Sequence, residues 1–393
     1  MAGVLRFFSV NKKPIIGGLI FGILSAIAVN AGNPDNMGLC VACFLRDIAG
    51  ALRLHATATV QYMRPEIFGF ILGAFGTSIL YREWKPRGGS SPILRFVLAM
   101  CVMTGAMVYL GCPSRALLRL SGGDLSALVA IPGMIVGIMI GIFFMKRGFS
   151  LGRASKMPAV AGLIIPLFAI VLFVLLIIKF DLLAFSSGAA DGSFPPGARY
   201  VNPWVGLGLG VIVGFIAQRT RFCSIGAWRD VILVRNFHLF SGVVAFFVGA
   251  LLVNYAVGNF GDAGLFGLNL SPEGRVISYH WGITNQPAAL PYASESFWTT
   301  MSQYAWSFLS FTLVGLAATF MGGCPLRNTI LAGEGDTDAG ISLIGYVVGG
   351  AVAMNFLIVS TKGGMGQYGG LAVAIGLVFC IALGFIMQER QKA

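Results

Sequence analysis

The feature that most constrains this chain is a succession of apolar runs, each close to the length that crosses a lipid bilayer. A helix needs about 20 mostly apolar residues to span the hydrocarbon core. Only 11% of the 393 residues are charged, against about 25% in soluble domains. Because helices satisfy their own backbone groups in lipid, the runs predict an all-α polytopic membrane protein. Ten long helices are expected, over residues 15–30, 65–82, 93–111, 125–146, 158–180, 203–218, 238–257, 299–322, 338–360 and 367–388.

Four further segments are too short to cross the membrane. They follow the first, third, sixth and eighth apolar runs, and each begins at a cysteine: Cys40 to Leu52, Cys112 to Leu120, Cys223 to Arg235, and Cys324 to Leu331. The chain therefore divides into two matching halves, each with five long helices and two short segments. Residues 1–180 form the first repeat, 181–202 the linker, and 203–393 the second repeat.

Two motifs occur once in each half. Gly-Cys-Pro-x-Arg spans residues 111–115 and 323–327, and in both copies a Gly-Asp pair follows, at 123–124 and 335–336. In the other motif, an Arg-Asp pair follows the cysteine by six and seven residues. These pairs are Arg46-Asp47 after Cys40 and Arg229-Asp230 after Cys223. The repeated spacings indicate a duplicated plan.

An odd number of crossings decides the symmetry. Five crossings in the first half make the second half start on the opposite side and run upside down, as in many secondary transporters. Most lysines and arginines fall in loops on one side, so the positive-inside rule predicts cytoplasmic termini in a prokaryotic inner membrane. This bias accounts for the net charge of +12 without nucleic-acid binding. The Cys40 and Cys112 segments would then enter from outside and the other two from inside, forming an hourglass.

Two regions leave alternatives open. Residues 258–297 have no counterpart in the first half and are predicted to be an extracytoplasmic insertion, either a cap over the outer mouth or a surface excursion. The run from Ile15 to Ala28 after Lys12 and Lys13 could also be read as a signal peptide. Because the second half has its own apolar run before Cys223, we expect the first half to keep this one.

The cysteines are candidate pathway residues because of where their motifs place them. Proline in Cys-Pro-x-Arg suits the first turn of a helix, which puts the cysteine at or near the N-cap. Free backbone N–H groups and the positive end of the helix dipole lie there. Helix N-termini that point at a constriction form an anion site. We therefore predict a substrate pathway through Cys40, Cys112, Cys223 and Cys324.

The charged motif residues have two interpretations. The four arginines could make the pathway electropositive, or each could neutralise the aspartate of its own motif. Because intramembrane charges usually pair, we favour pairing. The supporting residues are Arg46, Asp47, Arg115, Asp124, Arg229, Asp230, Arg327 and Asp336.

The remaining cysteines are expected to pack rather than to act. Cys101 and Cys380 stand alone in apolar helices. Cys43 forms a redox-type spacing with Cys40, but its counterpart in the second half is Gly226, so it is also assigned to packing. No cluster of histidine, cysteine and aspartate has metal-ligand spacing, and neither a metal nor a cofactor is predicted.

The paired motifs and the duplicated halves resemble the YeeE/YedE family of membrane proteins, also called the sulfur-transport family. Gly-Cys-Pro-x-Arg with a later Gly-Asp is most similar to the YedE branch associated with selenium metabolism. The resemblance implies an hourglass whose central cysteines pass a sulfur-containing anion through transient S–H contacts, and a cytosolic sulfur-carrier protein as partner. The thiosulfate branch is usually discussed with three such cysteines, whereas this chain has four.

Three functions follow from these observations. The favoured one is a permease for a sulfur- or selenium-containing anion, because weak and repeated sites favour passage over retention. The alternative is a relay protein that holds persulfide or selenide covalently on a cysteine and hands it to a cytosolic carrier. A membrane anchor without transport activity fits least, since it needs neither repeats nor polar breaks. The sequence shows no obvious sodium site and does not specify a coupling ion.

Overall fold

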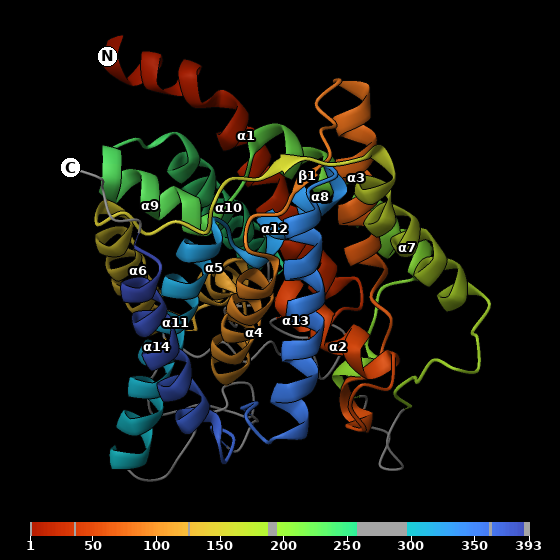
Figure 1. The fold of residues 1–393 in the computed structure, drawn as a ribbon. Helices are drawn as coiled ribbons and strands as arrows, with labels where there is room; N and C mark the ends of the chain where they lie inside the picture. The colour runs from red at the N-terminus through yellow and green to blue at the C-terminus, as the bar shows by residue number, and fades with distance from the viewer. Residues whose placement is uncertain are drawn as a thin grey trace.

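The computed structural model describes residues 2–34, 37–124, 126–187, 195–257, 297–360 and 364–388. It is a bundle of helices (Figure 1), which confirms the all-α membrane fold. Ten long helices lie where the apolar runs predicted them. They are α1 (Ala2–Asn30), α3 (Pro65–Leu80), α4 (Pro92–Tyr109), α6 (Ser126–Lys146), α7 (Ala159–Ile177), α8 (Pro203–Thr220), α10 (His238–Ala256), α11 (Phe297–Met321), α13 (Thr337–Asn355) and α14 (Gly369–Ile386).

Four short helices occupy the predicted cysteine segments: α2 (Val41–Ala51), α5 (Pro113–Ser121), α9 (Ser224–Val234) and α12 (Pro325–Gly333). Within the described residues, nine helical segments are long and apolar enough to cross a membrane. The remaining long helix, α3, has 16 residues. The insertion predicted at 258–297 lies outside the described residues, apart from its last position. The division into two repeats and a linker stays a prediction.

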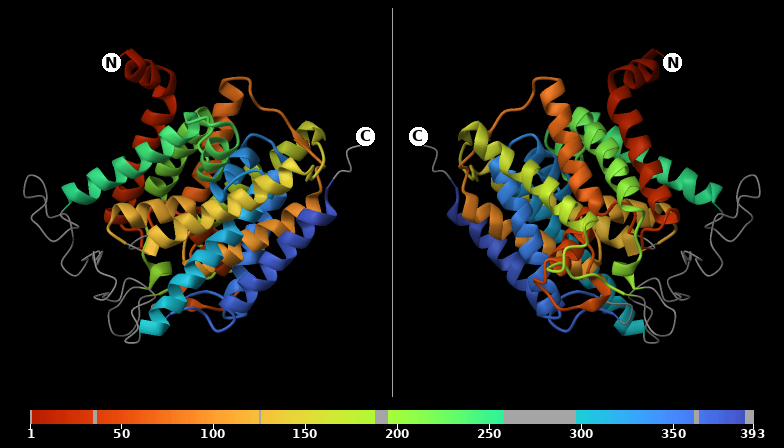
Figure 2. Two further views of the ribbon diagram at one scale, coloured as in Figure 1. Left: turned by 90° about the vertical axis from the view of Figure 1, so that its left-hand side faces the viewer. Right: turned by 90° about the vertical axis from the view of Figure 1, so that its right-hand side faces the viewer.

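The first helix is longer than predicted. The apolar run begins at Ile15, yet α1 continues back to Ala2 through Lys12, Lys13 and Pro14. Charged residues interrupt an apolar run but do not prevent a helix outside the bilayer. Proline inside a helix removes one backbone hydrogen bond and bends the axis, and the first turns of α1 project beyond the bundle (Figure 2).

Long helices of one half pack mainly against long helices of the other half. Helix α1 packs on α10, and the matching pair α3 and α8 also pack together. Likewise α6 packs on α11 while α4 packs on α13, and the corresponding helices α4 and α11 contact each other. Among the described segments that could cross a membrane, α11 with α12 is the most buried, with 89% of its most apolar stretch covered by protein, against 33% in α7. Each half therefore completes its packing against the other.

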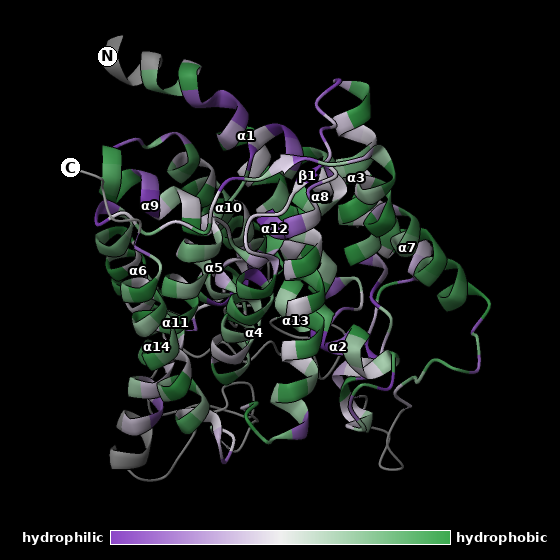
Figure 3. Ribbon diagram, in the orientation of Figure 1, coloured by the Kyte–Doolittle hydropathy of each residue, from purple (hydrophilic) through white to green (hydrophobic). Residues whose placement is uncertain are grey.

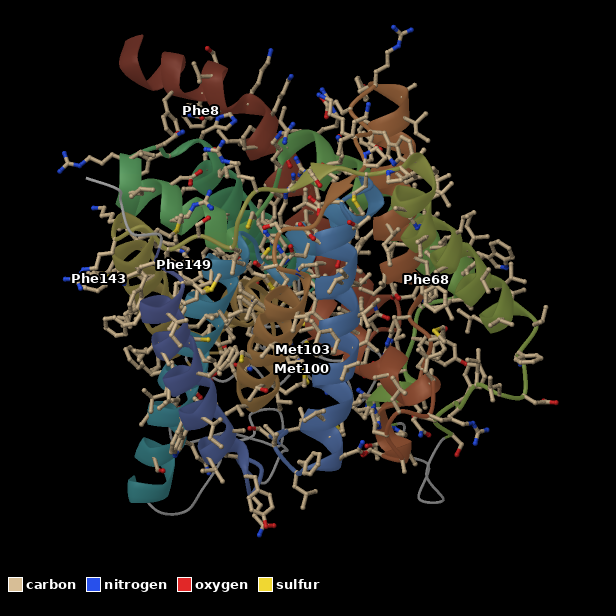
Figure 4. The ribbon with its side chains drawn as sticks, viewed as in Figure 1. Phe8, Phe68, Met100, Met103, Phe143 and Phe149 are labelled. Carbon is tan, nitrogen blue, oxygen red and sulfur yellow. The ribbon has the colours of Figure 1, made fainter. Side chains whose placement is uncertain are left out.

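Glycines allow the closest of these approaches. A Cβ atom on Gly137 of α6 would lie 2.0 Å from the carbonyl oxygen of Thr312, and one on Gly133 would lie 2.2 Å from that of Phe308. These glycines belong to the small-residue repeat at 133–141 that packs helices in membranes. On the other side of the core, Met100 and Met103 of α4 lie beside α13 (Figure 4), against Gly349.

The loops at one end of the bundle are tied together. The strands β1 (Arg87–Gly88) and β2 (Ser155–Lys156) pair antiparallel, and a bridge joins Phe149 to Gln388 after α14. The start of α1 and the end of α14 lie toward this same end, at the top of Figure 1. Hydrophobic residues extend along the long helices, whereas hydrophilic residues gather in the loops here (Figure 3). We call this the terminal end of the molecule.

Candidate functional site

Each motif cysteine is the N-cap of a short helix, as the sequence predicted. Cys40 precedes α2, Cys112 precedes α5, Cys223 precedes α9 and Cys324 precedes α12. All four have extended backbone angles, the usual conformation of an N-cap residue. In α9 and α12 the cysteine sulfur accepts a hydrogen bond from a backbone N–H of the first turn, Gly226 in α9 and Arg327 in α12.

The two cysteines of the first half meet. The Sγ atom of Cys40 lies 3.5 Å from that of Cys112 and 3.2 Å from that of Cys43. Cys112 also contacts the hydroxyl of Ser114 at 3.0 Å. We call Cys40, Cys43 and Cys112 the first sulfur cluster; all three are buried.

Cys43, which the sequence assigned to packing, is therefore in direct contact with Cys40, one of the predicted pathway residues. Arg115, from the Gly-Cys-Pro-x-Arg motif, donates to the sulfur of Cys43 over 2.9 Å. A hydrogen bond to a charged donor is stronger than one between neutral groups. The Cys-x-x-Cys spacing indicated a contact between Cys40 and Cys43. The comparison with Gly226 in the second half led to the packing assignment, but the two halves differ at this position.

The two cysteines of the second half also meet. The backbone N–H of Cys324 donates to the sulfur of Cys223 over 3.5 Å. We call this pair the second sulfur cluster, and both cysteines are buried. Nearby in α12, the side chain of Asn328 donates to the hydroxyl of Tyr346 in α13 over 2.8 Å. The structure thus brings the four motif cysteines into contact in pairs, one pair in each half. Their role as a pathway and a shared waist of all four stay predictions.

The remaining cysteines, Cys101 and Cys380, lie away from the motifs on α4 and α14. Cys380 is buried and Cys101 is half-buried. Among the residues that the structure describes, no group of three or more histidine, cysteine, aspartate or glutamate residues could hold a metal ion.

Two of the four expected arginine–aspartate pairs form. Arg46 binds Asp47 at 2.7 Å and Arg229 binds Asp230 at 2.9 Å. The aspartate of this motif directly follows its arginine, so the pairing needs no particular fold.

The other two pairings were wrong. Asp124 binds Arg119 at 2.6 Å instead of Arg115, because Arg119 lies in the last turn of α5, next to the aspartate. Asp336 binds Arg87 of β1 at 2.7 Å and caps α13 by accepting from Ala339.

Arg327 instead pairs with Glu334 at 3.0 Å. The seven-residue spacing of Arg327 and Glu334 puts them on one face of α12, a signal that sequence reasoning missed.

A buried charged network beside the first sulfur cluster was also missed. Arg64, fully buried before α3, donates to Asp47 of α2 over 2.8 Å. It also donates to two carbonyl oxygens, those of Pro196 and Arg199. Arg64 and its neighbour Glu66 border the apolar run that starts at 65, and their partners are far away in sequence, so no local spacing pointed to them.

A polar pocket of about 300 Å³ opens at the terminal end. Its walls come from the loop before β1, the end of α8 and the turn between α12 and α13. The lining residues are Glu83, Lys85, Arg87, Arg221, Glu334 and Asp336. Hydrogen bonds from Gln218 and then Arg219 hold the pKa of Glu83 below its ordinary value. Three cations and three carboxylates line this pocket, which lies at the C-terminal ends of α8 and α12.

Comparison with known proteins gives one partial relationship. The chain is 29% identical over 147 residues to the thiosulfate transporter TsuA of Escherichia coli (strain K12). The match covers 37% of this chain and 33% of the relative, so it spans about a third of that protein's length. No family model matches the chain. The match supports the YeeE/YedE family and does not bear on the selenium branch.

Proposed function

We propose that this multi-pass membrane protein is a permease for a sulfur-containing anion, with thiosulfate as the first candidate and a selenium compound as the second. The observation that carries the proposal is the placement of four buried cysteines at the N-caps of four short helices, in contact within each half. The relationship to a thiosulfate transporter supports the choice of substrate.

The physical chemistry of these N-caps suits a large, polarisable anion. Backbone N–H groups and the positive end of the helix dipole attract negative charge. A thiol is a weak hydrogen-bond donor, so each cysteine would hold the anion only loosely. Several weak sites in series allow entry and release, which is what conduction requires.

The contacts between helices of the two halves occur in matching pairs, and these pairs support the inverted repeat. If a two-fold axis in the membrane plane relates the halves, a contact of α1 with α10 implies a contact of α8 with α3, and both occur. The same relation links α6–α11 to α13–α4. We propose that the terminal end faces the cytoplasm of a prokaryotic inner membrane. The cysteines of α2 and α5 would then serve the outer half of the pathway, and those of α9 and α12 the inner half.

Inward transport of thiosulfate requires energy. Moving one charge against a potential of 100 mV costs about 2.3 kcal/mol, so a dianion costs about 4.6 kcal/mol against an inside-negative membrane. Accumulation therefore needs a coupled cation or consumption of the anion inside the cell. A cytosolic sulfur carrier would supply such consumption and belongs to the proposal through the family resemblance.

The test is uptake of labelled thiosulfate by cells that express the protein. Cys40→Ala, Cys112→Ala, Cys223→Ala and Cys324→Ala should each reduce initial uptake about fivefold or more, since loss of one buried hydrogen-bond donor costs roughly 1–3 kcal/mol. Cys101→Ala and Cys380→Ala are matched controls, because they remove thiols outside both clusters, and uptake should be preserved. Membrane levels are compared by immunoblot. If all four motif variants transport as well as the parent, the thiols do not line the pathway.

A second candidate function is a sulfur relay, which the contact between Cys40 and Cys43 favours. Cys43, next to Arg115, would attack the outer sulfur of thiosulfate as a thiolate and release sulfite, leaving a persulfide on Cys43. Mass spectrometry of protein incubated with thiosulfate would then show the mass of one added sulfur atom on the Cys43 peptide. Transport without any such adduct would exclude the relay.

A further inference from the structure

Glu66 is a buried acid that the proposed pathway does not use. It is the second residue of α3, and only 1% of its surface is exposed. Its Oε1 atom accepts a hydrogen bond from Asn33 over 2.9 Å. Its Oε2 atom is buried and has no hydrogen-bond partner in the described part of the chain. Burial of an incompletely paired carboxylate carries a large desolvation cost, so these surroundings suit the protonated acid.

The neighbouring elements offer little compensating positive charge. On α8, Gly206 and Gly210 lie against Glu66. The only charged residue of α8 is Arg219, which lies at the far end of that helix and binds Glu83. Helix α7, which also packs on α3, contains no charged residue.

Helix α12 also packs on α3. It meets α3 where Gly333 lies against Ile71, five residues after Glu66, and its Arg327 binds Glu334.

The remaining groups come from α2 and from the segment before α3. Tyr62 is buried, and its hydroxyl has no partner among the described residues. Arg64 is the nearest arginine in sequence, but it binds Asp47 of α2 at 2.7 Å. Asp47 also holds Arg46 at 2.7 Å. Two arginines therefore share one aspartate beside Glu66, and loss of the Glu66 proton would add a second carboxylate to compete for Arg64.

Two chains of hydrogen bonds lead from Glu66 toward α2, the helix that carries Cys43 and follows Cys40. In one, Asn33 donates both to Glu66 and to the carbonyl oxygen of Gly38, two residues before Cys40. In the other, Arg64 bonds to Asn33 over 3.5 Å and to Asp47 over 2.8 Å. Asp47 lies on α2, the helix that carries Cys43. Hydrogen bonds therefore connect Glu66 both to the segment that leads into the N-cap of α2 and to the body of that helix.

We propose that Glu66 is the proton-binding site that couples proton entry to anion uptake. The proposal rests on the proposed function and adds the coupling ion to it. A proton from the outer side binds Glu66 and leaves Arg64 on Asp47, which holds α2 in the arrangement described. Release of that proton toward the cytoplasm leaves a carboxylate that draws Arg64 from Asp47 and repositions α2. A ligand or proton shifts such an equilibrium only through its different affinity for the two states.

The experiment uses the full-length protein in liposomes with labelled thiosulfate and a pH-sensitive dye inside. With one coupled proton, each unit of outside acidification at zero potential should raise the accumulation ratio of the parent up to tenfold, since one pH unit is a tenfold change in proton activity. Thiosulfate addition should acidify the liposome interior. Glu66→Gln, which mimics the protonated acid, should still exchange thiosulfate across the membrane but lose both responses.

The control is Glu83→Gln, which removes a carboxyl that lines the polar pocket. We expect this variant to keep both the response to outside acidification and the acidification of the liposome interior. Infrared difference spectra give a readout without transport: a carboxylic acid band should titrate in the parent and in Glu83→Gln, and disappear in Glu66→Gln. Glu66→Asp should retain a titrating band and a shifted pH profile. A gradient response that persists in Glu66→Gln, or an unchanged band, overturns the proposal. If the parent takes up no thiosulfate yet shows the Glu66 band, the proposed function fails and the proton site remains.

Discussion

Cys43 is the residue whose interpretation the structure changes most. Its sulfur lies 3.2 Å from that of Cys40 and 2.9 Å from the guanidinium of Arg115. The motif arginine, expected to neutralise an aspartate, instead contacts a sulfur. The first sulfur cluster therefore has three thiols and a cation, whereas the second has a glycine at the equivalent position. The two sulfur clusters are therefore chemically different.

Cys43→Ala should therefore weaken uptake even though its counterpart is a glycine. Loss of a hydrogen bond with a charged partner costs roughly 1.5–3 kcal/mol, which predicts at least a tenfold rise in the thiosulfate concentration that half-saturates uptake. Cys380→Ala, another buried thiol, serves as the control and should leave this concentration unchanged. If the thiosulfate concentration that half-saturates uptake is the same in both variants, Cys43 only packs and does not contribute to uptake.

The sequence predicted ion pairs correctly only where the arginine and the aspartate are neighbours in the chain. Arg46 and Asp47 are neighbours, so their pairing was read correctly. The network of Arg64, Asn33 and Glu66 joins α1, α2 and α3 across 31 to 33 residues. Side-chain partners at such separations are decided by helix packing, which hydropathy does not encode.

At the scale of elements, the apolar runs located ten long helices and four short ones because the bilayer imposes their length. Their packing was less accessible to prediction. The glycine repeat of α6 packs closely on α11, which lies in the other half of the chain, so the sequence alone did not identify this partner. The first turns of α1 were missed for a different reason: they extend beyond the apolar run, where hydropathy gives no signal.

Gly137→Ala should destabilise the α6–α11 contact, since its Cβ would lie 2.0 Å from a backbone oxygen. Overpacking of this kind typically costs 1–3 kcal/mol, so the midpoint of thermal unfolding in detergent should fall. Gly208→Ala is the matched control, because a Cβ there has no atom within 4 Å, and its midpoint should stay level or rise. Equal midpoints for both variants would show that α6 and α11 separate without cost.

At the scale of the whole molecule, sidedness can be tested with two exposed positions at opposite ends. Lys85 lines the pocket of the terminal end, and Asn355 ends α13 at the other. In intact cells, a membrane-impermeant maleimide should label Asn355→Cys, and Lys85→Cys only after permeabilisation. The parent sets the background, since six of its cysteines are buried and Cys101 is half-buried. The reverse pattern would invert the proposed orientation.

The interleaving of the two halves also has a consequence for biogenesis. Because α4 lacks its neighbours α11 and α13 until the last third of the chain has been inserted, a nascent chain that has completed α7 exposes glycine-lined grooves to lipid. Fragments that end near residue 180 should therefore be degraded when made alone, and should be rescued when the complementary fragment is synthesised in the same cell. We therefore expect assembly to bring together two incomplete parts, with or without a covalent link between them.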